Sequence, residues 1–156
     1  MKIVRAKPTE LADIIAFEEK CFPCVTDRFA ARNILHQLKS ETCLILIAKD
    51  EEGKICALVT GFLRHFKHPS GRVYKIGVLP DFKRKGIGSL LLNKIENWFV
   101  KNKMKSSYAE VRESNTPSRS MFLKNGYKEI GKLYCYYGNL KESIELEDGV
   151  KYKKDL

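Results

Sequence analysis

The stretch FKRKGIGS, residues 82–89, places three cationic side chains directly before two glycines that flank one isoleucine. Glycines have no Cβ atom, so backbone N–H groups can converge there on a ligand, and the apolar run Leu90–Leu92 that follows predicts a helix with a positively polarised N-terminus. Lys83, Arg84 and Lys85 add mobile positive charge. The stretch therefore predicts a cradle for an anion, and a di- or polyphosphate is the expected ligand.

Other phosphate-binding patterns are not met at this turn. The dinucleotide-binding pattern GxGxxG fails because the residue three positions after Gly88 is Leu91, and the Gly-Lys-Ser/Thr of the phosphate loop does not follow. Gly-x-Gly alone is a weak signal. A helix-start turn with solvated lysines is therefore the alternative interpretation.

The turn must be held by the elements around it, and the spacing of apolar residues predicts four helices. A Thr-Pro pair predicts the N-cap and first turn of the last helix, and a glycine predicts its end. We expect the first helix to begin at Pro8 and the second to run from about Asp27 to Leu38. The third should cover residues 89–102 and the fourth residues 117–125, with Thr116 as the N-cap and Gly126 as the stop of the fourth.

Apolar runs rich in β-branched residues predict the strands, and the turn Asp50–Gly53 makes two of them a hairpin. The expected strands are IVRAK, CLILIAK, KICALVTGFLRHF, residues 71–79, SSYAEVR, YKEIG to LYCYY, and GVKYKK. The resulting order, β-α-α-β-β-β-α-β-α-β-β, predicts an α+β fold with a mixed sheet and helices on both faces, in a single domain over residues 1–156.

Composition narrows the class of protein. The chain has 156 residues, 44% of them hydrophobic and 31% charged, which suits one globular domain with a substantial core. No apolar run approaches the roughly 20 residues that cross a bilayer, and MKIVRAKPTE has no signal-peptide pattern, so we expect a cytoplasmic protein that does not use a membrane. The net charge of +10 is spread along the chain without interleaved aromatic residues, which makes nucleic acid an unlikely partner.

The five cysteines predict neither disulfides nor a metal site. Their number is odd, and Cys43 and Cys56 lie in apolar runs where a free thiol serves as a small core residue. Cys21 and Cys24 have the spacing of half a zinc site, but no second ligand pair accompanies them.

VLPDFKRKGIGSLLL resembles motif A of the GNAT superfamily of N-acetyltransferases, V-x-P-x-x-[R/Q]-x-x-G-x-[G/A], with Val78, Pro80, Gly86 and Gly88 in register. Lys83 stands where the family prefers Arg or Gln. Further on, AEVRESNTPSRSMFLKNGYKEIG resembles the second family signature, a strand followed by N-x-x-(A/S)-x-x-x-(Y/F)-x-x-x-G-(F/Y). The resemblance covers essentially the whole chain and implies a mostly antiparallel sheet.

Within the superfamily the sequence most resembles the protein N-terminal acetyltransferases, including those of the ribosomal-protein alanine type. AEVRESN is nearly their LEVRxSN, and Phe22-Pro23 matches their FP-W loop, although Cys24 stands in place of tryptophan. Their tail element is split here by an insertion between Tyr137 and Glu147. The resemblance implies that this region flanks the substrate entrance, with Phe22, Pro23, Tyr136 and Tyr137 as acceptor contacts.

The resemblance implies acetyl-coenzyme A as co-substrate and no metal. Its pyrophosphate would lie on the N–H groups of the glycine turn, its pantetheine arm would pair with the strand before the turn, and an asparagine would bind it from the other side. The implied cofactor residues are Ile76, Gly77, Val78, Lys83, Arg84, Lys85, Gly86, Ile87, Gly88, Ser89, Asn115 and Phe122.

An amine attacks a thioester only after losing its proton, so a nearby carboxylate is the natural base. Glu110 stands at the family's position for this base, and the alternative is that it is an ordinary exposed strand residue. Glu18, Glu19 and Glu113 are lesser candidates.

Phe122 stands where many members have a tyrosine that protonates the departing thiolate, and phenylalanine has no proton to give. A thiol with a pKa of about 8.5 can leave unaided. Otherwise a water or one of Tyr134, Tyr136 and Tyr137 substitutes, and we expect Tyr136 to be the second catalytic residue.

The sequence thus predicts transfer of an acetyl group to a primary amine, foremost a protein N-terminal α-amine, by a monomer or homodimer. Alternatives are a small-molecule amine or lysine acetyltransferase, or a non-catalytic module that binds acyl-coenzyme A or associates with RNA or the ribosome.

Overall fold

Seven strands form one sheet in the order β1-β2-β3-β4-β5-β7-β6 in the computed structural model, which describes residues 1–24, 27–137 and 146–156. The elements follow the predicted order, which confirms the α+β class. The strands are β1 (Lys2–Arg5), β2 (Cys43–Lys49), β3 (Ile55–Arg64), β4 (Ser70–Val78), β5 (Ser106–Arg112), β6 (Lys128–Tyr137) and β7 (Glu147–Asp155). The helices are α1 (Leu11–Cys21), α2 (Ala31–Lys39), α3 (Ile87–Lys101) and α4 (Thr116–Lys124), and the short 3-10 helices η1 (Pro8–Glu10) and η3 (Pro80–Phe82) precede α1 and α3.

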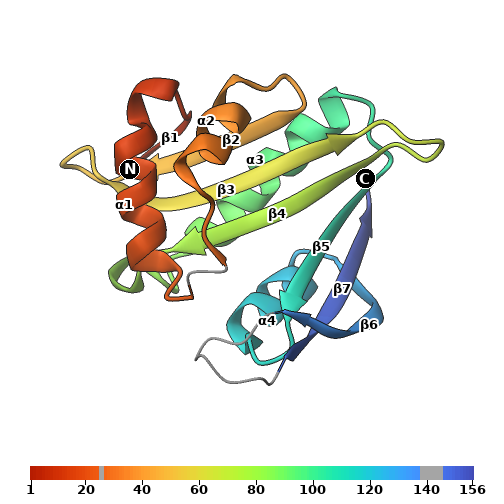
Figure 1. Ribbon diagram of the computed structural model, residues 1–156. Coiled ribbons are helices and arrows are strands. Elements are labelled where there is room, and N and C mark those ends of the chain that lie inside the picture. Colours follow the sequence, from red (N-terminus) through yellow and green to blue (C-terminus); the bar gives the residue numbers. More distant parts are fainter. Residues whose placement is uncertain (25–26, 138–145) are drawn as a thin grey trace.

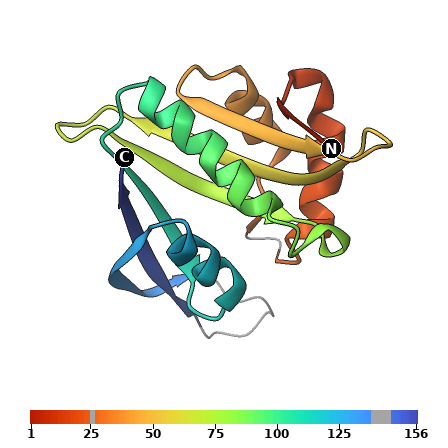
Figure 2. The same cartoon turned by 180° about the vertical axis from the view of Figure 1, so that it is seen from behind.

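Helices cover both faces of the sheet, as the opposite views in Figure 1 and Figure 2 show. On one face, Leu91, Ile95 and Phe99 of α3 are completely buried in the larger core. Helix α3 can lie this close because Gly71 of β4 has no side chain: a Cβ atom there would lie 2.3 Å from the Phe99 ring. On the other face, α1 and α2 form a second core around Ile14.

Strands β4 and β5 are parallel, whereas the other neighbouring strands described in the sheet are antiparallel. They pair only where Ser70–Val73 faces Ser106–Ala109. Beyond Val73, β4 stays beside β3 while β5 stays beside β7, so the two strands diverge toward their carboxyl ends (Figure 1). The divergence opens the middle of the sheet, and among the described residues no strand pairs with this edge of β4 beyond Val73.

Three predicted helix starts were wrong. Helix α2 begins at Ala31 instead of Asp27, because the Asp27 carboxylate is held by an arginine of β5. The N-cap of α4 is Asn115 instead of Thr116, since its Oδ1 accepts a hydrogen bond from the Ser118 N–H at 3.2 Å. Helix α3 begins at residue 87, two residues earlier than expected, directly after a glycine in the left-handed region. The predicted stop of α4 at Gly126 is confirmed by its φ of 86°.

Cys43 and Cys56 are buried in β2 and β3, as their apolar surroundings predict. Burial raises the pKa of Cys43 to about 12, so it remains a neutral thiol. None of the described helices is long and apolar enough to span a membrane. In the described part of the chain, His, Cys, Asp and Glu side chains form no group of three or more that could hold a metal ion.

Candidate active site

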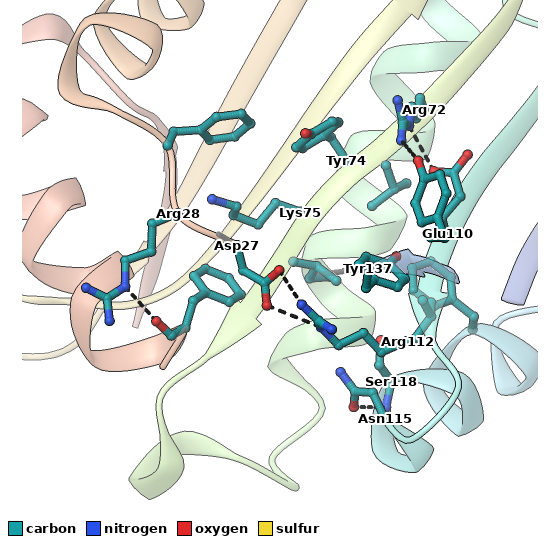
Figure 3. Close-up of a pocket in the computed structure, with 17 residues that line it drawn as sticks. Asp27, Arg28, Arg72, Tyr74, Lys75, Glu110, Arg112, Asn115, Ser118 and Tyr137 are labelled. Atoms are coloured by element: carbon teal, nitrogen blue, oxygen red, sulfur yellow. Dashed lines mark hydrogen bonds and ion pairs between the residues drawn. The ribbon is translucent and has the colours of Figure 1, made fainter. Parts of the chain in front are cut away.

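The diverging halves of β4 and β5 border a cleft with a volume of about 420 Å³ (Figure 3). Its walls come from the segment between α1 and α2, from β4 and β5, from the first turns of α4 and from the end of β6. The lining combines charged and aromatic side chains: Phe22, Asp27, Arg28, Phe29, Arg72, Val73, Tyr74, Lys75, Ile76, Glu110, Val111, Arg112, Asn115, Ser118, Phe122, Tyr136 and Tyr137.

Glu110 lines the cleft from β5, and its side chain is 9% exposed. Arg72 of β4 donates from Nε to Glu110 Oε2 at 2.9 Å and from Nη2 to the Tyr136 hydroxyl at 3.1 Å. Burial acts to lower the pKa of Arg72, but the charge of Glu110 and these two bonds outweigh it, so the pKa lies above its ordinary value. Arg72 therefore stays charged and holds Glu110 and Tyr136 in one arrangement.

Lys75 of β4 and Glu18 of α1 form a buried ion pair, with 2.8 Å between Nζ and Oε1 and side chains that are 7% and 4% exposed. Burial lowers the pKa of Lys75, and the charge of Glu18 offsets this only in part. Lys75 Nζ lies 4.1 Å from the centre of the Phe29 ring, and Glu18 Oε2 accepts a hydrogen bond from the Phe29 N–H at 2.9 Å. The pair therefore fixes the segment before α2 against the sheet.

Arg112 of β5 links two further walls of the cleft. Its Nη2 donates to Asp27 Oδ1 at 2.8 Å and its Nη1 to Glu147 Oε2 of β7 at 3.2 Å. Burial would lower the pKa of Arg112, but the two carboxylates raise it above its ordinary value. The guanidinium also lies over the Tyr137 ring, 4.5 Å from its centre, and burial raises the pKa of Tyr137 so that the phenol keeps its proton.

The predicted phosphate turn leads from η3 into α3, and its residues are not among those that line the cleft. Gly86 is the N-cap of α3 with a left-handed φ of 76°, and a Cβ atom there would meet no atom within 4 Å, so the turn borders open space. The first N–H groups of a helix have no acceptor within the helix. Gly88 additionally makes room for α4, because a Cβ atom there would lie 2.8 Å from Met121 Sδ. The turn therefore fits an anion bound by backbone N–H groups.

Asn115 and Phe122 line the cleft from α4. The Asn115 cap uses Oδ1, and its amide NH₂ remains a donor. The Phe122 ring is 2% exposed and lies between Tyr152, stacked with 5.9 Å between ring centres, and Tyr127, edge-on at 5.0 Å. Phe122 therefore packs the base of the cleft.

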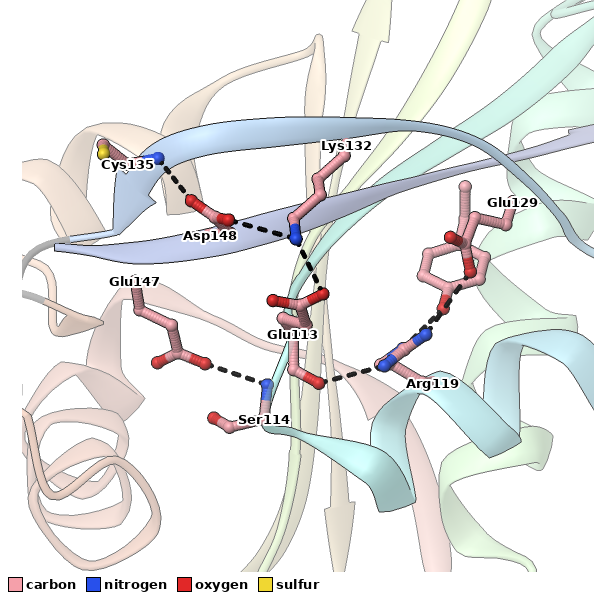
Figure 4. A network of polar contacts seen from close by, with 9 residues as sticks. Glu113, Ser114, Arg119, Glu129, Lys132, Cys135, Glu147 and Asp148 are labelled. Atoms are coloured by element: carbon pink, nitrogen blue, oxygen red, sulfur yellow. Dashed lines mark hydrogen bonds and ion pairs between the residues drawn. The ribbon is translucent and has the colours of Figure 1, made fainter.

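Polar contacts fix the turn between β5 and α4 to the last two strands (Figure 4). Glu147 Oε1 accepts from the Ser114 N–H at 2.9 Å. Lys132 bridges Glu113 at 3.1 Å and Asp148 at 3.2 Å. The start of α4 is therefore held by β6 and β7.

Residues 11–127, well over half of the chain, match the acetyltransferase (GNAT) family. The chain belongs to this family. The resemblance that motif A and the second signature carry is thereby confirmed.

Comparison of this GNAT chain with known proteins finds acetyltransferases similar to it in sequence and in fold. Over 70 residues it is 36% identical to an N-alpha-acetyltransferase of Sulfurisphaera tokodaii, and the match spans 44% of this chain and less than half, 42%, of that relative. Its fold matches the ribosomal-protein-S18-alanine N-acetyltransferase of Escherichia coli with a TM-score of 0.81 and 19% identity, over 99% of this chain and 92% of the other. It also matches Arabidopsis thaliana NAA60 in complex with acetyl-CoA, with a TM-score of 0.85 and 12% identity, over 99% and 98% of the two chains.

The cleft gathers many of the residues that the GNAT resemblance singles out. Glu110, Tyr136, Tyr137 and Phe22 line it, as do Ile76, Asn115 and Phe122 from the predicted cofactor set. Val78, Pro23, Gly77 and the turn residues Lys83, Arg84, Lys85, Gly86, Ile87, Gly88 and Ser89 do not.

Several of the predicted site residues that do not line the cleft have a structural role. The Pro23 carbonyl accepts a hydrogen bond from Arg28 Nη2 at 3.0 Å. A Cβ atom on Gly77 would lie 2.6 Å from Cys21 Sγ, so this glycine lets α1 approach β4. The Ser89 hydroxyl accepts from the Asn125 side chain at 2.9 Å.

The other candidate acids and bases are placed less favourably for chemistry. Unlike Glu110, the carboxylates of Glu18, Glu19 and Glu113 do not line the cleft. Tyr134 is 77% exposed and also lies outside the lining. The predicted insertion, up to residue 145, lies outside the described residues.

Arg72, Lys75, Asp27 and Arg112 line the cleft but were not singled out from the sequence. Arg72 and Lys75 did carry a signal: they interrupt the apolar strand GRVYKIGV, where a buried charge needs a partner. Asp27 carried none, because its partner Arg112 lies 85 positions away.

Proposed function

We propose that this GNAT chain transfers the acetyl group of acetyl-coenzyme A to the α-amine of a protein N-terminus. The observation that carries the proposal is the position of Glu110, a carboxylate in the cleft where β4 and β5 part. The named relatives, which include an N-alpha-acetyltransferase and a ribosomal-protein alanine acetyltransferase, support this class of acceptor.

Acetyl-coenzyme A supplies an activated acetyl thioester, and the chain has two places that fit it. The glycine turn offers helix-start N–H groups beside Lys83 and Arg84, which suit the pyrophosphate. The free edge of β4 beyond Val73 suits the two amides of the pantetheine arm, which would add to the sheet as a short strand does. The Asn115 amide would donate from α4.

Glu110 would act as the base that removes a proton from the acceptor ammonium, directly or through one water. Arg72 would be a positioning residue, because its 2.9 Å ion pair fixes the carboxylate. The neutral amine then forms the new C–N bond as the C–S bond breaks, and the proton that leaves the amine balances the one that the thiolate takes up.

Tyr136 would supply the proton that Phe122 lacks. Its hydroxyl oxygen accepts from Arg72, so its own proton is left to donate into the cleft. We expect Tyr136→Phe to lower kcat by about 10²-fold, the low end of acid catalysis, whereas Phe122→Tyr should change kcat less than about threefold. Steady-state rates of both variants measure this, and an unchanged Tyr136→Phe rate would favour unaided loss of the thiolate.

The function is tested by thiol release from acetyl-coenzyme A with four acceptor classes: peptides with free N-termini, N-terminally blocked lysine peptides, polyamines and aminoglycosides. Mass spectrometry of the products locates the acetyl group. We expect the highest kcat/KM with free N-terminal peptides and acetyl only on the α-amine. Preferential turnover of a blocked lysine peptide or a small amine would refute the proposed acceptor.

A further inference from the structure

Lysines gather on the face of β5, β7 and β6 that also carries Glu110. Directly opposite residues on neighbouring strands share a face. The register sets Lys151 opposite Glu110, Lys153 opposite Tyr108, and Lys128 opposite Lys153. The contact of Lys151 Nζ with the Tyr108 ring, 5.3 Å from its centre, agrees with this placement. Positive charge therefore continues from the cleft along these strands.

The lysines lead to a second hollow of about 500 Å³ at the start of β5. Lys67 and Lys105 are exposed there and stand beside His68, Tyr108 and Lys153. Asp155 also lines the hollow, where it pairs with Lys153 at 2.9 Å, so positive charge exceeds negative charge at this place. We call Lys67, Lys105, Lys128, Lys151 and Lys153 the basic track.

Arg64, at the end of β3, lies close enough to Arg72 for the two positive charges to repel each other. Burial and then the positive charge of Arg72 lower the pKa of Arg64, and the negative charge of Glu110 does not compensate. An additional anion here would relieve this repulsion.

The track has the length of a short peptide. From Glu110 to Ser106, β5 covers four residue steps, or about 13 Å at the usual rise of a strand. An extended acceptor whose α-amine lies at Glu110 covers this distance in about the same number of residues. Helices α1 and α2 lie over the first four strands, whereas no described helix covers β5 and β7 on that side (Figure 1). A polypeptide can therefore run from the cleft to the second hollow.

We propose that the end of the basic track at the second hollow, with Lys67, Lys105 and Lys153, binds acidic side chains of the acceptor polypeptide at about its fifth to eighth residues. This inference rests on the proposed function and adds a substrate class to it, namely N-termini followed by Asp and Glu. An acidic peptide suits the track better than nucleic acid does, because the track is continuous with the cleft in which the acceptor amine must lie.

The test uses acceptor peptides that share their first four residues and carry either Glu and Asp or Gln and Asn at positions five to eight. An amidated tetrapeptide with the same first four residues is the third acceptor. At low ionic strength we expect kcat/KM to be about five- to tenfold higher for the acidic peptide, chiefly through KM, and the preference to vanish near 1 M salt.

The triple variant Lys67→Ala/Lys105→Ala/Lys153→Ala should lose the preference and keep the wild-type kcat/KM for the tetrapeptide. Lys94→Ala, an exposed lysine of α3 on the opposite face, is the matched control and should keep the preference. Equal use of acidic and neutral peptides by the wild type, or a preference that survives in the triple variant, overturns the proposal.

The remaining outcomes separate this proposal from the proposed function. If all peptides are acetylated equally well whatever their charge, the proposal for the basic track is refuted and the proposed function stands. Failure to acetylate any peptide, the tetrapeptide included, refutes the proposed function and the track with it. If the triple variant loses affinity for a single-stranded RNA oligonucleotide while peptide preference is unchanged, the track belongs to nucleic acid and the proposal fails.

Discussion

The walls of the cleft and the phosphate turn both carry many charges, but they use them in opposite ways. In the walls three cations face acidic partners across the fold: Arg72 pairs with Glu110, Lys75 with Glu18, and Arg112 with two carboxylates. In the turn, Lys83 and Arg84 have no acidic partner within the part of the chain that the structure describes. The charges of the walls thus fix the shape of the cleft, whereas those of the turn remain available for a ligand.

This difference predicts where substitutions act. Removing one member of the most deeply buried wall pair, Lys75 and Glu18, leaves a buried charge without compensation, so folding suffers. Changing the turn should leave folding intact and affect ligand binding. The following predictions test both statements, beginning with the largest effect.

Lys75→Met should destabilise the protein by about 3–5 kcal/mol, because Glu18 would remain buried without its partner. Urea unfolding measures the change. The double variant Glu18→Gln/Lys75→Met should recover much of the loss, since it buries no lone charge and the new side-chain amide oxygen can still accept from the Phe29 N–H. Equal stability of the single and double variants would show that the pair does not set the stability of this wall.

Glu110→Gln should lower kcat by about 10²-fold or more and leave the Kd of acetyl-coenzyme A almost unchanged, since it removes the base and keeps the size of the side chain. The loss should shrink as the pH rises past the α-amine pKa of about 8, where the neutral amine forms without help. Glu113→Gln, in an exposed ion pair with Lys132, is the control and should keep its rate. Wild-type kcat in Glu110→Gln from pH 6 to 9 would refute the role of Glu110.

Gly86→Glu should raise the Kd of coenzyme A by tenfold or more, because it places a negative charge and a side chain in the anion cradle. Calorimetry measures the affinity. Gly53→Glu is a matched control: Gly53, in the β2–β3 turn, has a φ of 79°, and a Cβ atom there also meets nothing within 4 Å, so both variants carry the same backbone strain. Equal affinity in the two variants would contradict the phosphate turn.

The difference between the paired charges of the cleft walls and the charges of the phosphate turn also explains which features could be predicted from the sequence. The turn depends on backbone shape and neighbouring charges, all within eight consecutive residues, so its pattern is visible in the sequence. The strands and helices were predictable because Leu91, Ile95 and Phe99, for example, repeat at helical spacing. The predicted position of Glu110 in the active-site region came from the family pattern around it.

The pairs in the walls could not be predicted in this way. Lys75 and Glu18 are 57 positions apart, and Arg72 and Glu110 are 38 apart. Local periodicity contains no information on which distant charges meet. The start of α2 was misplaced for the same reason, since Asp27 is drawn to Arg112 of β5.

The smallest expected effect concerns the outer edge of the walls, where Glu147 joins Arg112 and the Ser114 N–H. Burial would raise the pKa of Glu147, but these bonds outweigh it and hold the pKa below its ordinary value of 4.5. The unfolded chain therefore binds a proton at Glu147 more readily, so the stabilisation is fully present above about pH 4.5 and is lost as the pH falls through the folded-state pKa.

Because Glu147 is partly exposed, we expect Glu147→Gln to cost about 1 kcal/mol or less at pH 7. The difference in unfolding free energy between wild type and variant should shrink below pH 4.5, and measuring it as a difference cancels the titration of the other carboxylates. A difference that stays constant from pH 7 to pH 3 would mean that Glu147 contributes through packing and not through its charge.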